Sequence, residues 1–147
     1  MADSLDPYKF DGLKVKKASN ELRQFSTKLF ELIGVEFEDT LELERQVIAA
    51  FCFGALNAIV QRDEISEPQA HALTIALLIN EFKYSEKQAV DFAQDLIQAT
   101  NKEYHPVMNA IIHRGIDGHY QFEKNIGGDL KDNLLDVINV VRDVAKH

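Results

Sequence analysis

Cysteine is almost missing from the 147-residue sequence, and tryptophan is missing altogether. The one cysteine, Cys52, lies inside an apolar run and has no second cysteine with which to form an internal disulfide. A disulfide-stabilised fold is therefore excluded, and a reducing compartment is expected. The N-terminal residues MADSLDPYKF lack the apolar core of a secretory signal, so we expect the protein to be cytoplasmic.

Basic residues are also in short supply. The sequence contains 16 Lys and Arg against 24 Asp and Glu, which gives a net charge of −8 and a pI of about 5.0. Binding to nucleic acid requires clustered Lys and Arg, so we do not expect a nucleic-acid partner. A chain with this charge suits a basic protein partner, because complementary charge speeds association.

Long hydrophobic runs are lacking as well. The longest nearly uncharged segment, residues 47–60, has 14 residues, whereas a transmembrane helix needs about 20. The segment is apolar almost all round, with only Gly54 and Asn57 interrupting it, as is typical of a helix at the centre of a core. We therefore expect no membrane partner, and we expect Gly54 to let a neighbouring helix approach closely.

Helical periodicity is what the sequence does contain, and it predicts an all-α fold of about six helices in a single domain over residues 1–147. Residues 1–13 are expected to form a loose lead-in. The second and third helices are apolar enough to be the two central ones. The first predicted helix starts at residue 14 or 19 and ends at 33, and the others span 41–62, 67–82, 86–98, 103 or 105 to 123, and 129–145.

Several helix starts carry capping residues. Ser66 and Ser85 are each followed three residues later by glutamine, which predicts a capping box at the start of the third and fourth helices. Thr40 is the expected N-cap of the second helix. Residues 35–44, VEFEDTLELE, alternate apolar and acidic side chains, but no second strand is available to pair with them, so we predict a loop.

The fifth predicted helix contains the stretch YHPVMNAIIHRGIDGHYQF, which holds three of the five histidines of the chain. Each residue advances about 100° around a helix, so the apolar side chains of this stretch fall within one arc that faces the core. Two glycines in or near the arc predict close packing against another helix. The arc consists of Met108, Ile111, Ile112, Phe122, Gly115 and Gly118.

The other side of the same helix carries a row of polar side chains. Tyrosine and arginine are typical anchors of protein interfaces, so the row predicts a surface that contacts a partner. An internal network that joins the helix to a neighbour is an equally good interpretation. His119 lies at the edge of the apolar arc, outside this row. The row consists of Asn109, His113, Asp117 and Tyr120, flanked by Arg114 and Gln121.

A metal or catalytic site in this helix is a weaker interpretation. His113 and Asp117 lie one turn apart and could reach one ion, but zinc needs further ligands that no spacing places beside them. An Asp-oriented histidine is half of a catalytic triad, yet Cys52 lies in an apolar helix and the G-x-S-x-G motif is lacking. We therefore expect no enzymatic activity, no metal and no cofactor, and keep a small metal-dependent or His–Asp hydrolase as an alternative.

Three stretches of the sequence are similar to a known family. They are FCFGALNAIV, QAHALTIALLINEFKYSEKQAVDFAQDLIQAT and YHPVMNAIIHRGIDGHYQ, within residues 45–122. Together they resemble the bacterial polymorphic-toxin immunity proteins of family forty-eight, and the last stretch is the most specific. The resemblance implies an all-α, non-enzymatic protein that neutralises a cognate protein toxin by binding it. A helical adaptor or regulatory module with another partner remains an alternative.

Two sets of residues are the predicted contacts with such a toxin. The first set is the polar row together with the flanking arginine, and the second is the acidic part of residues 36–44, for which a solvated loop is the plainer interpretation. The first set consists of Asn109, His113, Arg114, Asp117 and Tyr120, and the second of Glu36, Glu38, Asp39, Glu42 and Glu44.

Overall fold

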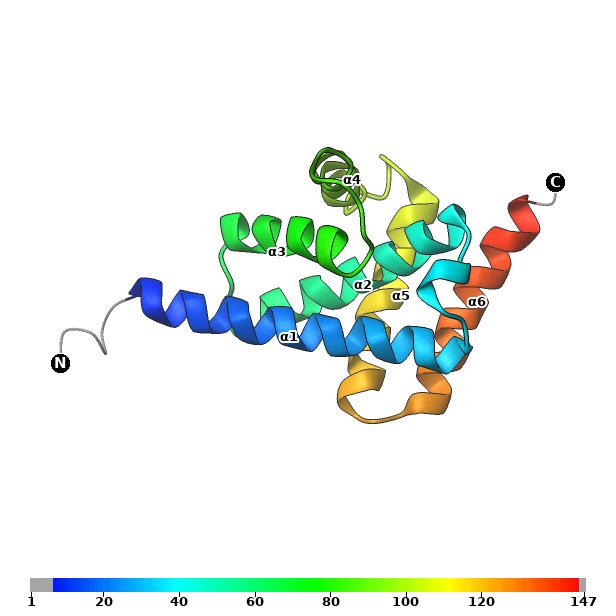
Figure 1. The fold of residues 1–147 in the computed structure, drawn as a ribbon, viewed down its shortest axis with the longest axis horizontal. Helices are drawn as coiled ribbons and strands as arrows, with labels where there is room; N and C mark the ends of the chain where they lie inside the picture. Colours follow the sequence, from blue (N-terminus) through cyan, green and yellow to red (C-terminus); the bar gives the residue numbers. More distant parts are fainter. Residues whose placement is uncertain (1–6, 146–147) are drawn as a thin grey trace.

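The computed structural model describes the backbone of residues 7–145 and the side chains of residues 12–142, and the regular elements in this range are all helical (Figure 1). The prediction of an all-α fold with six α-helices is confirmed. In chain order the elements are α1 (Pro7–Ile33), the short 3₁₀ helix η2 (Phe37–Asp39), α2 (Glu42–Asp63), α3 (Glu67–Asn80), α4 (Glu86–Gln98), α5 (Pro106–Glu123) and α6 (Gly127–Ala145).

The start of the first helix differs from the prediction. α1 already begins at Pro7, so the expected loose lead-in is wrong for residues 7–13, and residues 1–6 lie outside the described range. Proline is tolerated in the first turn of a helix, because the N–H that it lacks would have no partner there. Gly12 costs only about 1 kcal/mol relative to alanine, which a helix of this length tolerates when its inner face is packed.

Ser66 and Ser85 cap their helices as predicted, but of the two predicted capping boxes only the one at Ser85 is complete. Ser85 Oγ accepts a hydrogen bond from Gln88 N at 3.1 Å, and Gln88 Oε1 accepts one from Ser85 N at 3.0 Å, which completes a capping box. Ser66 Oγ accepts from Gln69 N at 3.4 Å and donates to Gln69 Oε1 at 3.0 Å. Both pairs satisfy backbone N–H groups at a helix start that would otherwise lack a partner.

The segment before α2 is more ordered than the predicted loop. η2 occupies its middle, and Thr40 ends η2 instead of capping α2, because the Thr40 hydroxyl donates to Phe37 O at 2.5 Å. Leu41 takes the N-cap position of α2, and its backbone N–H donates to Glu44 Oε1 at 3.0 Å. The prediction for Thr40 is therefore wrong, since a nearby carbonyl competes for its side chain.

α2 is the central helix, as its composition predicts. Eleven of its residues are buried, among them every residue from Val47 to Leu56. The whole helix is long and apolar enough to cross a membrane by length and composition, which the 14-residue run alone did not indicate. Its most apolar window is, however, 61% buried by the other helices, which is the behaviour of a core helix.

α2 and α5 pack backbone to backbone. A Cβ atom added at Gly54 would lie 2.0 Å from Ile112 O, and one added at Gly115 would lie 1.9 Å from Phe51 O. No side chain fits at these distances, so the predicted role of these glycines in close packing is confirmed. The sequence placed α3 beside α2 at the centre, and α3 does contact α2, but the closest approach to α2 comes from α5.

The remaining helices surround this pair. α1 runs along one side of the molecule and contacts α2, α3 and α6, and α4 packs on α3 (Figure 1). α6 closes the other end of the molecule, where it packs on α5 and α2. The arrangement leaves the outer face of α5 open beside α6, and it brings the C-terminal end of α1, η2 and the turn after α3 together around one groove.

Candidate functional site

The three histidines of the stretch at 104–122 lie in three different environments. His105 is the N-cap of α5, where its Nδ1 accepts a hydrogen bond from Met108 N at 3.1 Å. His113 is exposed, and His119 is buried with only 2% of its surface accessible. The helical periodicity of the stretch predicts that the three histidines lie apart, and they do not meet at one point.

Asn109 does not belong to an exposed row. Its side chain is buried and donates hydrogen bonds to Ala99 O at 3.0 Å and Thr100 O at 3.2 Å. These carbonyls lie at the end of α4, where helix geometry leaves them without an internal partner. Asn109 therefore ties α5 to the end of α4, and the prediction that it lies on the surface is wrong because the unsatisfied carbonyls draw its amide inward.

His113, Asp117 and Tyr120 do lie on the outer face of α5, as predicted. Tyr120 is 58% exposed, and the Lys124 ammonium lies 5.7 Å from the centre of its ring. Within the described side chains, no hydrogen bond or ion pair uses any of the three polar groups, so His113 and Asp117 are not bonded to each other. These side chains are free to contact another molecule.

Arg114 turns instead to α6. Its Nε donates to Asn133 Oδ1 at 2.5 Å, and its Nη2 lies 3.4 Å from Asp136 Oδ2. Asn133 in turn donates to Arg114 O at 2.9 Å and to Gln121 Oε1 at 3.1 Å. The internal-network interpretation is therefore correct for Asn109 and the flanking residues, whereas His113, Asp117 and Tyr120 stay exposed and their contact with a partner stays a prediction.

The exposed row borders an acidic depression of about 390 Å³ between α5 and α6. Asp117 contributes one wall from α5, and three aspartates of α6 contribute the other. Arg114 is the basic residue among the lining side chains, so the depression is negatively charged. The three aspartates of α6 are Asp129, Asp132 and Asp136, all exposed.

A second polar centre escaped the sequence analysis. Arg62 lies among three carboxylates, at 2.7 Å from Glu21 Oε1, 2.7 Å from Glu123 Oε2 and 2.9 Å from Asp63 Oδ1. His119 Nε2 lies 2.5 Å from Glu21 Oε2, and its Nδ1 lies 3.5 Å from Glu123 Oε1. This cluster, hereafter the Arg62 cluster, joins α1, α2 and α5 at one edge of the core.

The charges of the Arg62 cluster support one another. Burial opposes the ionisation of Glu21, but hydrogen bonds from Arg62 and His119 outweigh it and hold the pKa of that carboxyl below its ordinary value. The hydrogen bond from Arg62 likewise lowers the pKa of Asp63. Hydrogen bonds to Asp63 and Glu21 raise the pKa of the Arg62 guanidinium, which is charged at any pH at which the protein folds.

The same cluster has three side chains that could be metal ligands. One ligand atom each of Glu21, His119 and Glu123 lies within 4.8 Å of the others, which is the spacing that a bound cation requires. Arg62, however, already donates to both glutamates and supplies the positive charge that a cation would bring. The geometry is that of a satisfied ion-pair network, and it does not support a metal centre.

The second predicted contact set also contains both residues with internal partners and residues without them. Glu42 accepts a hydrogen bond from the Tyr84 hydroxyl at 3.0 Å, and Glu44 Oε2 accepts one from Arg142 Nε at 2.8 Å. Glu44 therefore joins α2 to α6, and Glu42 joins α2 to the turn between α3 and α4. The side chains of the remaining members, Glu36, Glu38 and Asp39, are exposed.

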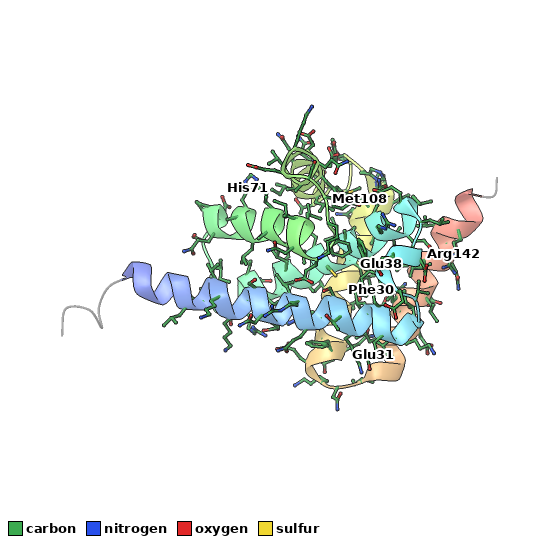
Figure 2. All side chains as sticks on the ribbon, viewed as in Figure 1. Phe30, Glu31, Glu38, His71, Met108 and Arg142 are labelled. Atoms are coloured by element: carbon green, nitrogen blue, oxygen red, sulfur yellow. The ribbon has the colours of Figure 1, made fainter. Side chains whose placement is uncertain are left out.

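Glu36 and Glu38 line a groove of about 660 Å³ at the C-terminal end of α1. Figure 2 shows Glu38 beside Phe30, and both Phe30 and Glu31 come from α1 and line the same groove. His71, by contrast, lies on α3 away from this group (Figure 2). Sequence reasoning found the η2 side of the groove through its acidic pattern, and it missed the α1 side.

Cys52 is not placed to act as a nucleophile. Its side chain is fully buried on α2, and this burial, together with the charge of Glu81, raises the pKa of the thiol far above its ordinary value. A thiolate is the reactive form, so the thiol is inert where it lies. The structure agrees here with the expectation from the sequence.

The sequence of residues 18–142 matches the family described as immunity protein 48. The chain belongs to the immunity protein 48 family. The match includes most of α1 and α6, which the resemblance at 45–122 did not cover, so both predicted contact sets and the Arg62 cluster lie within it. No curated protein and no solved structure matches the chain. For this member of the immunity protein 48 family, the residues that act on a partner must therefore be inferred from its own geometry.

Proposed function

We propose that the protein neutralises a cognate toxin by binding to it directly, in the cytoplasm of the cell that produces both, and that it does so without catalysis. Membership of an immunity protein family supports a toxin as the partner. The observation that carries the binding mode is the outer face of α5, where His113, Asp117 and Tyr120 are exposed and make no polar contact with other described side chains.

The chemistry of this face suits a basic partner. Tyrosine buries a large amphipathic ring at low entropic cost and is enriched among residues that dominate binding energy. The adjacent aspartates of α6 extend the negative charge that Asp117 begins, over a continuous depression. Complementary charge would steer a basic toxin to this face and fix its orientation there. A non-catalytic role also accords with the inert Cys52 and with the separation of the histidines.

A protection assay in cells tests the proposal. The toxin encoded beside the gene of this protein is expressed with and without the wild-type chain, and with a variant carrying His113→Ala, Asp117→Ala and Tyr120→Ala. We expect the wild type to restore growth and the variant to protect poorly, with affinity reduced at least about tenfold, because a tyrosine anchor and a rim charge are lost.

A matched control separates binding from folding. Lys87→Ala, Asp91→Ala and Gln94→Ala remove three exposed side chains from α4, and this control should protect as the wild type does. Full protection by the α5 variant at normal thermal stability would contradict the proposed contact face. Failure of the wild type itself to protect against the neighbouring toxin would contradict the proposed function.

A further inference from the structure

The groove at the C-terminal end of α1 combines aromatic surface with an acidic rim. Phe30 and Phe37 line it, with their ring centres 5.9 Å apart in an edge-to-face contact, and both rings are only partly buried. The rim carries four carboxylates from three separate parts of the chain, which are Glu31, Glu36, Glu38 and Glu81. At about 660 Å³, the groove is large enough for one or two long side chains of another molecule.

The carboxylates of the rim have little counter-charge of their own. Within the described side chains, Glu36, Glu38 and Glu81 form no ion pair, and Glu31 has only Lys28 at 4.0 Å. Lys83 is the basic residue that lines the groove. The four carboxylates outnumber the basic side chains around the groove, so its net charge is negative, in contrast to the paired carboxylates around Arg62.

Two helix ends add to the negative potential. α1 ends at Ile33 and α3 ends at Asn80, and residues directly after both ends line the groove. The C-terminal end of a helix carries a partial negative charge, because its last carbonyls have no partner within the helix. The chain already places one cation at such an end, since Lys83 Nζ donates to Asn80 O at 2.9 Å.

The aromatic surface favours the same kind of ligand. The guanidinium of Arg45 lies 4.9 Å from the centre of the Phe37 ring, which shows that this ring accepts a cation over its face. Long basic side chains combine an apolar stem with a charged head, so they match a groove with phenyl rings inside and carboxylates at the rim. Neutral and acidic side chains lack one or both of these complements.

We propose that this groove is a second contact surface, which receives a lysine- or arginine-bearing segment of the protein partner. The inference rests on the proposed function for the identity of that partner as a toxin, and on the groove alone for the chemistry of the segment. It assigns a binding role to Glu36 and Glu38, whereas the nearby Glu42 and Glu44 are used in hydrogen bonds within the fold.

A basic peptide tests the chemistry without any toxin. A short peptide of alternating arginine and lysine is titrated into the full-length ¹⁵N-labelled protein at low salt, and amide shifts are followed by NMR. We expect the largest shifts at residues 26–38 and 81–83, and at least about tenfold weaker binding by the Glu36→Lys, Glu38→Lys variant. Asp91→Lys with Glu103→Lys makes the same change of charge at exposed positions elsewhere, and it should weaken binding less than about twofold.

Three outcomes would overturn the inference. Shifts spread evenly over all acidic surfaces, or equal losses in the two double variants, would mean that net charge alone attracts the peptide. The largest shifts around the α6 aspartates would place the basic segment in the other depression. Binding of free arginine amide as tightly as the peptide would make the occupant a small cation instead of a protein segment.

The toxin itself tests the identity of the partner. With the toxin encoded beside the gene, Glu36→Lys with Glu38→Lys should weaken the complex at least about tenfold at an unchanged melting temperature, and the Asp91, Glu103 control should not. Unchanged affinity of the groove variant for a toxin that the wild type binds would overturn the groove alone. If the wild type binds no toxin, the proposed function fails, and the peptide result decides the chemistry of the groove.

Discussion

Two acidic regions of the protein differ in how much counter-charge the chain itself supplies. In the Arg62 cluster, one guanidinium and one buried histidine lie among three carboxylates, and each carboxylate has a partner within the chain. In the groove beside η2, four glutamates line the surface, three of them exposed and Glu81 partly buried, with one weak ion pair among them. The first region therefore stabilises the fold, and the second is available to a partner that brings positive charge.

α5 repeats this contrast within a single helix. Asn109 and His119 point inward and are fully used, one at the end of α4 and the other beside Glu21. His113, Asp117 and Tyr120 point outward and have no polar partner among the described side chains. A polar residue type is therefore a poor guide to function in this protein, and the presence or absence of an internal partner is a better one.

The largest expected effect comes from adding a side chain at the close contact between α2 and α5. Gly115→Ala would place a Cβ atom 1.9 Å from Phe51 O, so two backbones must move apart and the core must loosen. We expect a loss of about 3 kcal/mol or more in the free energy of unfolding, measured by denaturant titration. Gly128→Ala is the control, since nothing lies within 4 Å of its added Cβ. Equal stability of both variants would show that the backbones are not in contact.

Removal of the central cation of the Arg62 cluster should have the next largest effect. Arg62→Met keeps an apolar stem but leaves Glu21, Asp63 and Glu123 to repel one another. Because Arg62 is about a third exposed, we expect a loss of about 2 kcal/mol in the free energy of unfolding, less than for a fully buried pair. Toxin affinity at a temperature where the variant is folded should not change. A weaker complex at full stability would place the cluster in the interface and remove the contrast.

A neighbouring pair on α5 gives a sharper and smaller contrast. Asn109→Ala leaves Ala99 O and Thr100 O without their donor, so we expect about 1–2 kcal/mol of destabilisation in thermal or denaturant unfolding. His113→Ala, one turn further on, should change stability by less than about 0.5 kcal/mol and should weaken toxin binding instead. A large loss of stability for His113→Ala together with no loss for Asn109→Ala would contradict the assignment of Asn109 as internal and His113 as exposed.

The smallest expected effect concerns how the free energy of unfolding decreases at acidic pH. In the folded protein the pKa of Glu21 lies below its ordinary value of 4.5, so the unfolded chain binds a proton at this carboxyl more readily. The stabilisation that ionised Glu21 gives to the fold is therefore fully present above pH 4.5 and is lost as the pH falls through the folded pKa. Glu21→Gln should cost about 1 kcal/mol at neutral pH and should flatten the decline of stability below about pH 4.5. Parallel stability curves for the variant and the wild type would contradict this.

Local features of the fold could be predicted from the sequence. Ser85 and its glutamine lie three residues apart, and periodicity of 3.6 residues is enough to assign the buried face of α5. Gly54 could be assigned to a close approach because it interrupts a helix that has no need of a turn. The prediction of Thr40 as an N-cap was wrong because the carbonyl of Phe37 and the backbone N–H groups at the start of α2 compete for its hydroxyl, and the sequence does not show which contact is preferred.

Contacts between distant residues could not be predicted. His119 and Glu21 lie 98 residues apart, and Arg62 lies 41 residues from Glu21, so no spacing brings them together. The groove likewise needs α1, η2 and the turn after α3 to converge, and only the acidic pattern of residues 36–44 marked it in advance. With one sequence, such clusters appear only when the packing of the helices is known.

Calorimetric titration of the purified protein into the purified toxin tests the central claim most directly. The toxin to use is a candidate from a gene that neighbours the gene of this protein, and its activity is followed in the same samples. Our account predicts a saturable complex, with toxin activity falling in proportion to the complex formed and neither protein altered covalently. Full protection in cells without any complex between the purified proteins would contradict neutralisation by direct binding.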